Sequence, residues 1–191
     1  NKTEAKVPFY IKEFKEKVDN IKISDDFVNN ISKHVLENSD MNVPSSIVDI
    51  FIKTNKELRE KNLKTIREVV KKNLVNDMKT SFDIKPFIRL PNAATFAQFG
   101  ERRHYFYGEE KIDEAWHLGM DWASVKRAEV QVSNPGKVIF KDYLGIYGDT
   151  VIIDHGLGVG TLYAHTSSIN VELNDEVKAG QHIANTGATG A

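Results

Sequence analysis

The sequence predicts an α+β protein, with a helical region at residues 1–82 followed by a mainly antiparallel β domain at residues 86–191. All 12 glycines lie between Gly100 and Gly190. Because glycine favours turns and positive φ, the chain is expected to turn often only in this second part. The first part instead carries apolar residues at three- and four-residue steps, and the second carries short β-type runs between glycine-rich turns.

Composition and charge limit the classes of protein that fit. With 40% hydrophobic and 28% charged residues, the chain is ordinary for a globular protein with a real core. Its net charge of −1 gives no electrostatic footprint for nucleic acid, so no nucleic-acid partner is expected. The absence of cysteine excludes a disulfide scaffold and a thiolate zinc site, which leaves His, Asp and Glu as possible metal ligands.

The helical region is expected to contain two capped helices and one long amphipathic helix. Ser24 and then Ser45 or Ser46 are suitable N-caps for the first two. From about Thr54 to Met78 the apolar positions recur at helical spacing, with Lys and Glu on the other faces. This pattern favours a helix that packs on its neighbours, and the alternative is a coiled-coil or partner-binding helix.

The β domain is expected to begin after a linker with a short lead-in strand at residues 87–90, between Pro86 and Pro91. Short β-type runs then recur at Glu129–Val132, Lys137–Phe140, Asp149–Asp154, Gly160–His165 and Glu176–Lys178. Strands of this length and spacing indicate an antiparallel sandwich or barrel.

The stretch of residues 117–122 is the first candidate for chemistry. If it is a strand, His117 and Asp121 point to one face with Gly119 between them, which leaves room for an ion and a substrate. The apolar residues at positions 118, 120 and 122 would then point into a core. A structural His–Asp pair is the alternative, since spacing alone is weak evidence for metal binding.

His165 is the second candidate. It follows Tyr163 on another β-type run, so the two side chains are expected to share a face. A zinc hydrolase needs three protein ligands and an open position for water, and His117, Asp121 and His165 would complete that set. A structural role for His165 is the alternative. His155 is expected to serve a turn, and His104 to belong to a solvated basic cluster.

Several motifs follow one another in a distinctive order over residues 86–191. They are Phe99-Gly100-Glu101-Arg102-Arg103, His117-Leu118-Gly119-Met120-Asp121, Gly148-Asp149-Thr150 through Asp154-His155-Gly156, Leu162-Tyr163-Ala164-His165, Val177-Lys178-Ala179-Gly180-Gln181 and Thr186-Gly187-Ala188-Thr189-Gly190. This order closely resembles the LytM/lysostaphin-type zinc metallopeptidases of the bacterial envelope. The helical region carries no such resemblance.

The resemblance implies a largely antiparallel β fold and a zinc site with His117 and Asp121 as ligands. It reassigns His165 from ligand to catalytic residue, assisted by Tyr107 or, as a weaker choice, Tyr105. In the family the third ligand is the second histidine of a His-x-His motif after the Thr-Gly-x-Thr-Gly turn. The sequence stops at Ala191, before that motif, so the third ligand is expected beyond Ala191.

The function implied is hydrolysis of peptide crosslinks in peptidoglycan, by an endopeptidase that also has D,D-carboxypeptidase activity, in cell-wall remodelling or cell shape. The expected partners are peptidoglycan peptide stems, and the expected location is the periplasm, with any anchor outside this chain. The alternative is a non-catalytic LytM-like protein that binds peptidoglycan or regulates a partner hydrolase. The N-terminal helices are expected to be a latency segment, a scaffold or a docking surface for another envelope protein.

Overall fold

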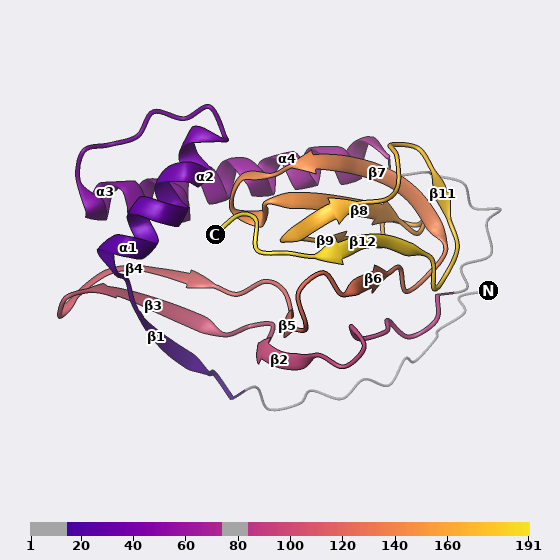
Figure 1. Ribbon diagram of the computed structural model, residues 1–191, viewed down its shortest axis with the longest axis horizontal. Coiled ribbons are helices and arrows are strands. Elements are labelled where there is room, and N and C mark those ends of the chain that lie inside the picture. Colours follow the sequence, from indigo (N-terminus) through magenta and orange to yellow (C-terminus); the bar gives the residue numbers. More distant parts are fainter. Residues whose placement is uncertain (1–14, 74–83) are drawn as a thin grey trace, which may run out of the picture.

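The computed structural model describes residues 15–73 and 84–191, which form an α+β fold with helices at the N-terminal side and mainly antiparallel sheets after them (Figure 1). The helices form two continuous runs. The first comprises α1 (Asp25–Phe27), the π-helical turn η1 (Val28–Ser32) and α2 (Lys33–Glu37), and the second comprises α3 (Ile47–Ile52), the π-helical turn η2 (Lys53–Leu58) and α4 (Arg59–Lys72).

The predicted caps are confirmed. The Ser24 hydroxyl accepts a hydrogen bond from Phe27 N at 3.1 Å, and the Ser46 hydroxyl accepts one from Asp49 N at 3.4 Å. The second and third predicted helices form one continuous run, because α3 passes directly into η2 and η2 passes directly into α4. The predicted end of the long helix, at Met78, lies outside the described residues. No helix in the described part of the chain is long and apolar enough to cross a membrane.

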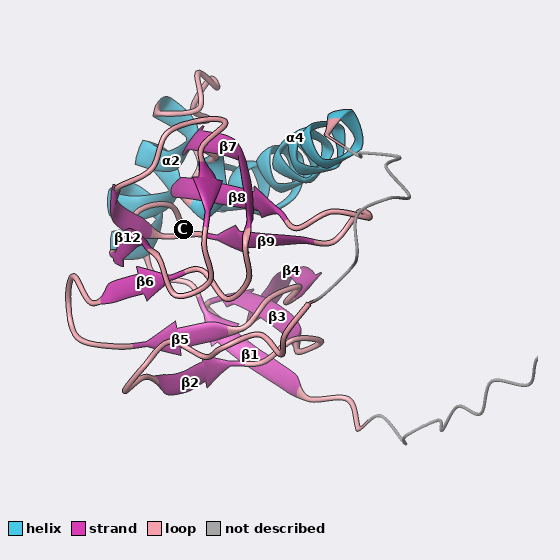
Figure 2. Cartoon of the chain, turned by 90° about the vertical axis from the view of Figure 1, so that its right-hand side faces the viewer, coloured by secondary structure: helices cyan, strands magenta, loops and turns pink. Residues whose placement is uncertain are grey.

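The five β-type runs expected between Glu129 and Lys178 are all found as strands, and they are part of a set of eleven strands in residues 84–191. The eleven are β2 (Ala94–Ala97), β3 (Arg102–Tyr107), β4 (Glu110–Trp116), β5 (Asp121–Ala123), β6 (Glu129–Gln131), β7 (Gly136–Tyr143), β8 (Asp149–Asp154), β9 (Gly160–Tyr163), β10 (Thr166–Ile169), β11 (Glu176–Val177) and β12 (His182–Thr186), with the 3-10 turn η3 (Gly145–Tyr147) before β8. Their sheets have the orders β11-β7-β8-β9, β10-β12-β6 and β2-β5. Figure 2 shows the helices on one side of the β7–β8–β9 layer and β2 to β5 on the other.

Two local predictions are wrong. Residues 87–90 are not a strand; Ile88 N instead donates a hydrogen bond to the Ser133 hydroxyl at 3.0 Å. In the helical region, Val18–Lys22 forms strand β1, which pairs in parallel with β3 from Val18↔Arg102 to Lys22↔Phe106. The pairing satisfies the edge of the β3–β4 hairpin, a long-range requirement that a local helical pattern does not reveal.

The helical region and the β part share a hydrophobic core. Its members are Ile23, Val28, Val35, Leu36, Ile50, Phe51, Leu58, Tyr105 and Ile146. Tyr105 comes from β3 and Ile146 from η3, so two side chains of the β part are buried among the helices. A second core lies inside the β part, around Val138, Val151 and Ile153. The predicted boundary between two domains at residues 82–86 therefore stays a prediction, and the two regions pack against each other.

The salt bridge between Lys17 and Glu101 joins the residue before β1 to the residue before β3, at 2.5 Å. The Glu101 side chain is 3% exposed, and the hydrogen bond from Lys17 lowers the pKa of this carboxyl although burial opposes it. Replacing Lys17 by methionine is expected to reduce the free energy of unfolding at pH 7 by about 1–3 kcal/mol, because the buried carboxylate of Glu101 loses its charged hydrogen-bond donor. Urea denaturation measures this loss.

The pH dependence of that loss has a definite sign. Because the folded pKa of Glu101 is lowered, its contribution is present above the unfolded value of about 4.3 and is lost as the pH falls through the folded pKa. The difference between the two proteins should therefore shrink on acidification. Lys141→Met is the control, since its partner Glu172 is 78% exposed and the pair should contribute less than about 1 kcal/mol. Equal losses in the two variants would contradict the prediction.

Candidate metal centre

His117 lies between the end of β4 and the start of β5. Its backbone N donates a hydrogen bond to Glu101 O at 2.8 Å, and its carbonyl accepts one from Gly100 N at 2.8 Å. Asp121 opens β5 and is paired with Ala97 of β2. The backbone on both sides of the stretch is therefore held by neighbouring segments, which fixes the two side chains relative to each other.

The side chains of His117 and Asp121 meet, with Nε2 3.1 Å from Oδ1. The other ring nitrogen, Nδ1, lies 2.8 Å from the carbonyl oxygen of Gln98. Because a carbonyl oxygen only accepts, Nδ1 must carry a hydrogen, and in the neutral ring the lone pair of Nε2 faces the carboxylate. Two electron-rich atoms at this distance need a proton or a cation to hold them together.

This arrangement fits a zinc ion. Imidazole and carboxylate ligands bind zinc at about 2.0–2.2 Å, which separates two ligand atoms of a tetrahedral site by roughly 3.3 Å. Gly119 leaves space beside the ring, since even a Cβ at this position would lie 3.8 Å from Nε2. Within residues 15–73 and 84–191, no group of three or more His, Cys, Asp and Glu side chains is placed to hold a metal. His117 and Asp121 therefore offer two ligands of the expected three.

Arg103 was not recognised from the sequence as part of this site. Its guanidinium donates to the second carboxylate oxygen of Asp121 at 3.1 Å. Burial raises the pKa of Asp121, but the hydrogen bonds and positive charges of His117 and Arg103 outweigh it, so the pKa is lowered. The sequence Arg102-Arg103-His104 by itself predicts a solvated basic cluster. Strand alternation was the available signal, because Arg103 shares a face of β3 with the buried Tyr105.

Contrary to the prediction, Leu118 and Met120 do not point into a core, and Trp122 is only partly buried. Leu118 is 58% exposed and Met120 47% exposed, and Phe96 on β2 is 78% exposed. Residues 117–120 do not form the predicted strand, since the chain bends at Gly119 and β5 begins only at Asp121. Residues four apart on an extended strand would lie roughly 13 Å apart, so the contact between His117 and Asp121 depends on this bend. The prediction that the side chains of His117 and Asp121 lie together is confirmed by their contact, but the predicted strand over residues 117–122 is wrong for residues 117–120.

His165 lies in the turn between β9 and β10, with φ of +56°. The prediction that it continues the strand is therefore wrong. Its backbone N donates to Tyr147 O at 2.8 Å, and its Nδ1 lies 2.7 Å from Thr189 O. Since the carbonyl only accepts, Nδ1 carries the hydrogen, and Nε2 of the neutral ring is available to accept a proton. Tyr163 does not share its surroundings, because the Tyr163 hydroxyl accepts a hydrogen bond from Ser133 N at 3.2 Å.

The Thr186–Gly190 turn holds the ring of His165 in place. The Thr189 hydroxyl accepts a hydrogen bond from Asp149 N and donates one to Thr166 O, both at 2.9 Å. Gly148 has φ of +62°, and a Cβ there would lie 2.4 Å from the Thr189 carbonyl carbon. The close approach of two backbone segments, which only glycine permits, therefore sets the position of the carbonyl that receives the His165 hydrogen bond.

Neither tyrosine is brought to the His117–Asp121 pair. Tyr107 ends β3 opposite Glu110, five residues along the strand from Arg102, whose partner Trp116 precedes His117. This spacing corresponds to roughly 16 Å. The Tyr107 hydroxyl donates to Asp25 Oδ1 at 2.8 Å, and this bond raises its pKa. Tyr105 is 6% exposed in the helical core. The hairpin register thus separates the predicted assisting residue from the predicted ligands.

His155 has a structural role, as expected. Its Nδ1 lies 2.7 Å from Pro135 O and its Nε2 lies 2.9 Å from the Thr161 hydroxyl. Both ring nitrogens are therefore occupied at the turn after β8. His104 is less solvated than predicted. Its side chain is 21% exposed, and its Nε2 lies 3.7 Å from Glu114 Oε2.

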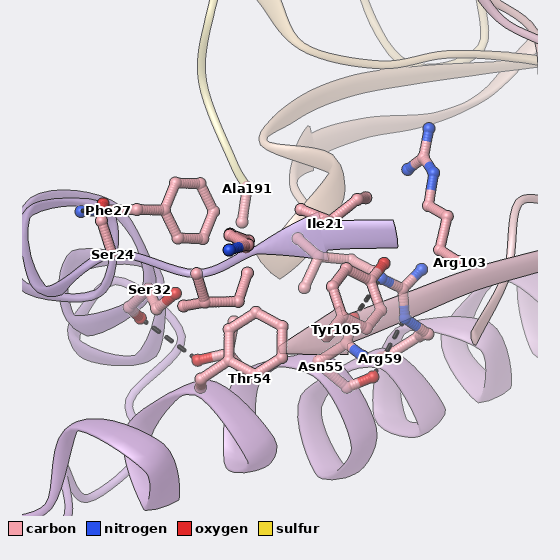
Figure 3. Close-up of a pocket in the computed structure, with 14 residues that line it drawn as sticks. Ile21, Ser24, Phe27, Ser32, Thr54, Asn55, Arg59, Arg103, Tyr105 and Ala191 are labelled. Carbon is pink, nitrogen blue, oxygen red and sulfur yellow. Dashed lines mark hydrogen bonds between the residues drawn. The ribbon is translucent and has the colours of Figure 1, made fainter. Parts of the chain in front are cut away.

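A cavity of about 410 Å³ lies between the helical region, β1, β3 and the last residue of the sequence (Figure 3). Thr54, Asn55 and Tyr105 are among its lining residues, and Arg103 lies at its edge. Figure 3 shows the Arg103 guanidinium extending away from Thr54 and Ser32. Arg103 therefore both lines this cavity and contacts Asp121 through its guanidinium.

Comparison with known proteins finds similarity over the part of the chain that contains these residues. Residues 115–191 match the model of peptidase family M23. The chain is 34% identical over 114 residues to the DD-carboxypeptidase/endopeptidase Mpg of Neisseria meningitidis serogroup B. The matched segment covers 59% of this chain and 24% of that protein. It is 37% identical over 84 residues to the murein hydrolase activator EnvC of Escherichia coli K12, which covers 44% of this chain and 20% of that protein.

The fold is also found in solved structures. A Pseudomonas aeruginosa crystal structure assigned to peptidase M23 superposes with a TM-score of 0.52 and 22% identity, over 70% of this chain and 50% of that one. At this identity the likeness concerns the fold alone. The curated relatives are much longer than the matched segments, since the chain spans about a quarter of their length or less.

Proposed function

We propose that the protein is a zinc-dependent peptidase that hydrolyses peptide crosslinks of peptidoglycan, because residues 115–191 match the model of peptidase family M23. The relative named DD-carboxypeptidase/endopeptidase, 34% identical over 114 residues, supports this substrate class and a D,D-carboxypeptidase activity. The observation that carries the proposal is the contact of His117 Nε2 with Asp121 Oδ1, while Nδ1 is committed to Gln98 O.

In this proposal His117 and Asp121 hold the zinc ion as two of its protein ligands. Bound zinc would polarise the scissile carbonyl and lower the pKa of its water to about 7. Gln98 O keeps the His117 ring in the tautomer that exposes Nε2, and Arg103 holds the second oxygen of Asp121. Such outer contacts orient ligands and tune their basicity.

His165 is the proposed catalytic base. With Nδ1–H donated to Thr189 O, its Nε2 can accept a proton from the attacking water and return it to the leaving amine. The tautomer is set before substrate arrives, so no ring reorientation is needed. Tyr107 could assist only after its bond to Asp25 is broken and the hairpin has moved, and the proposal does not depend on it.

The test uses the full-length protein and purified peptidoglycan, with released muropeptides measured by chromatography. Cleavage is expected, with loss on treatment with a chelator and recovery on addition of zinc. His117→Ala should abolish both cleavage and recovery, whereas His34→Ala should leave them unchanged, because the His34 side chain is 62% exposed on α2. Cleavage that survives the chelator, or no cleavage with zinc present, would refute the proposal.

A regulatory role is the second candidate. It is favoured by the similarity to EnvC and by 36% identity over 78 residues to the murein hydrolase activator NlpD of Salmonella dublin. In that case the protein would bind peptidoglycan or another envelope hydrolase without cleaving stems itself. If the protein sediments with intact peptidoglycan sacs in the presence of zinc but releases no muropeptides, that result would favour this role over catalysis.

The proposed location is the bacterial envelope, in the periplasm. An outer membrane antigenic lipoprotein B of Histophilus somni is 38% identical over 73 residues, which supports an envelope setting. Peptide stems of peptidoglycan are accessible there to a periplasmic enzyme. Fractionation of cells that express the full-length protein tests the assignment.

A further inference from the structure

The η3 turn connects the helical region to the surroundings of His165. Its central residue, Ile146, is 5% exposed and belongs to the core formed by the helices. Its backbone N donates a hydrogen bond to Asn62 Oδ1 at 3.1 Å. Asn62 lies within α4 and is itself 5% exposed, so this is a buried polar contact between the two regions.

The turn fits closely around the Asn62 amide. Gly145 has φ of +49°, and a Cβ there would lie 2.5 Å from Asn62 Oδ1. Backbone bonds from Leu144 N to Gly148 O at 2.8 Å and from Gly148 N to Gly145 O at 3.0 Å close the turn on itself. A compact turn that is pinned at its centre has little freedom to shift relative to α4.

The same turn holds His165 from two sides. Tyr147 O accepts the hydrogen bond from His165 N at 2.8 Å. Gly148 packs against Thr189, whose carbonyl receives the His165 Nδ1 hydrogen bond, and Ala191 N donates to Ile146 O at 3.0 Å. The η3 turn and the adjoining Gly148 therefore contact both the backbone of His165 and Thr189, which is the hydrogen-bond partner of its ring.

We propose that Asn62 is a positioning residue for His165, and that the helical region thereby fixes the Nδ1–H tautomer of this histidine through η3. The catalytic meaning of this contact rests on the proposed function, but the contact itself does not. The helical region would then be a lasting part of the active site. It would not be a latency segment that is removed for activity.

The test replaces Asn62 by leucine, which has a similar volume and no acceptor. In nitrogen-resolved NMR spectra of the imidazole rings, the Nδ1–H signal of His165 is expected to move or broaden. If the proposed function also holds, kcat of the full-length enzyme should fall roughly 10- to 100-fold, as is typical for the loss of an orienting partner, with KM changed less than about twofold. Asn62→Asp keeps an acceptor oxygen and should restore the signal in part.

Asn55→Leu is the matched control. Asn55 is 6% exposed in the same helical run, and its Nδ2 donates to Asp113 Oδ2 of β4 at 2.7 Å, so its loss also removes a buried contact between the regions. It should lower stability but leave the His165 signal in place. An unchanged signal in Asn62→Leu, or an equal change in both variants, would overturn the proposal. A shift of the signal in a protein without peptidase activity would refute the proposed function and leave the positioning intact.

Discussion

Replacing His165 by alanine is expected to lower the rate of muropeptide cleavage by the full-length protein by about 10²–10⁴-fold, the usual contribution of a general base. The imidazole is oriented for this role, because Nδ1 donates to Thr189 O and Nε2 of the neutral ring is left as the acceptor. The measurement is kcat on a defined crosslinked muropeptide with saturating zinc, followed by chromatography. Zinc content should stay close to that of the parent protein, since His165 is not a proposed ligand.

The backbone at position 165 requires a second variant. Its φ of +56° is unfavourable for alanine, so some loss of activity in His165→Ala could come from strain. Asparagine tolerates this region of φ better and also lacks the imidazole, so His165→Asn should be as inactive as His165→Ala while folding more stably. His155→Ala removes a structural histidine with two ring contacts and should retain cleavage. Activity of His165→Asn near the parent level would exclude the base assignment.

The strand pattern around the metal pair shows how far local sequence reasoning extends. The sequence correctly places His117 and Asp121 together, but strand alternation is not the reason, because the chain bends between them at Gly119 and β5 begins only at Asp121. Which side chains are buried here depends on the rest of the fold: Arg103 contacts Asp121, while Leu118 and Met120 are exposed. The prediction that Leu118 and Met120 face a core is wrong because it assumes a strand that residues 117–120 do not form.

The parts that could not be predicted all depend on long-range pairing. Strand β1 exists because β3 offers it an edge about 80 residues later, although its own sequence lies in a helical region. His165 was expected to continue β9, but bonds to Tyr147 and Thr189 hold it in a left-handed turn. Conversely, the caps at Ser24 and Ser46 were predictable, since each involves residues only three apart.

Replacing Gly148 by alanine is expected to reduce the free energy of unfolding by about 2–5 kcal/mol, the largest stability loss among the substitutions considered. Its φ of 62° and ψ of −149° lie in a region that is essentially restricted to glycine, which costs about 1–3 kcal/mol for other residues. The new Cβ would also lie 2.4 Å from the Thr189 carbonyl carbon and 2.5 Å from its oxygen. Because these are backbone atoms, relief requires the Thr189 turn to move, and such overpacking costs a further 1–3 kcal/mol or so.

Gly108→Ala separates the two contributions. Gly108 has a similar φ of +59°, but a Cβ there would have no atom within 4 Å, so only the conformational cost of about 1–2 kcal/mol applies. Urea denaturation of both variants gives the difference, and the Nδ1–H signal of His165 reports whether Thr189 has moved. We expect this signal to change in Gly148→Ala alone. Equal losses of stability with an unchanged His165 signal would show that contact between Gly148 and Thr189 does not set the position of the histidine.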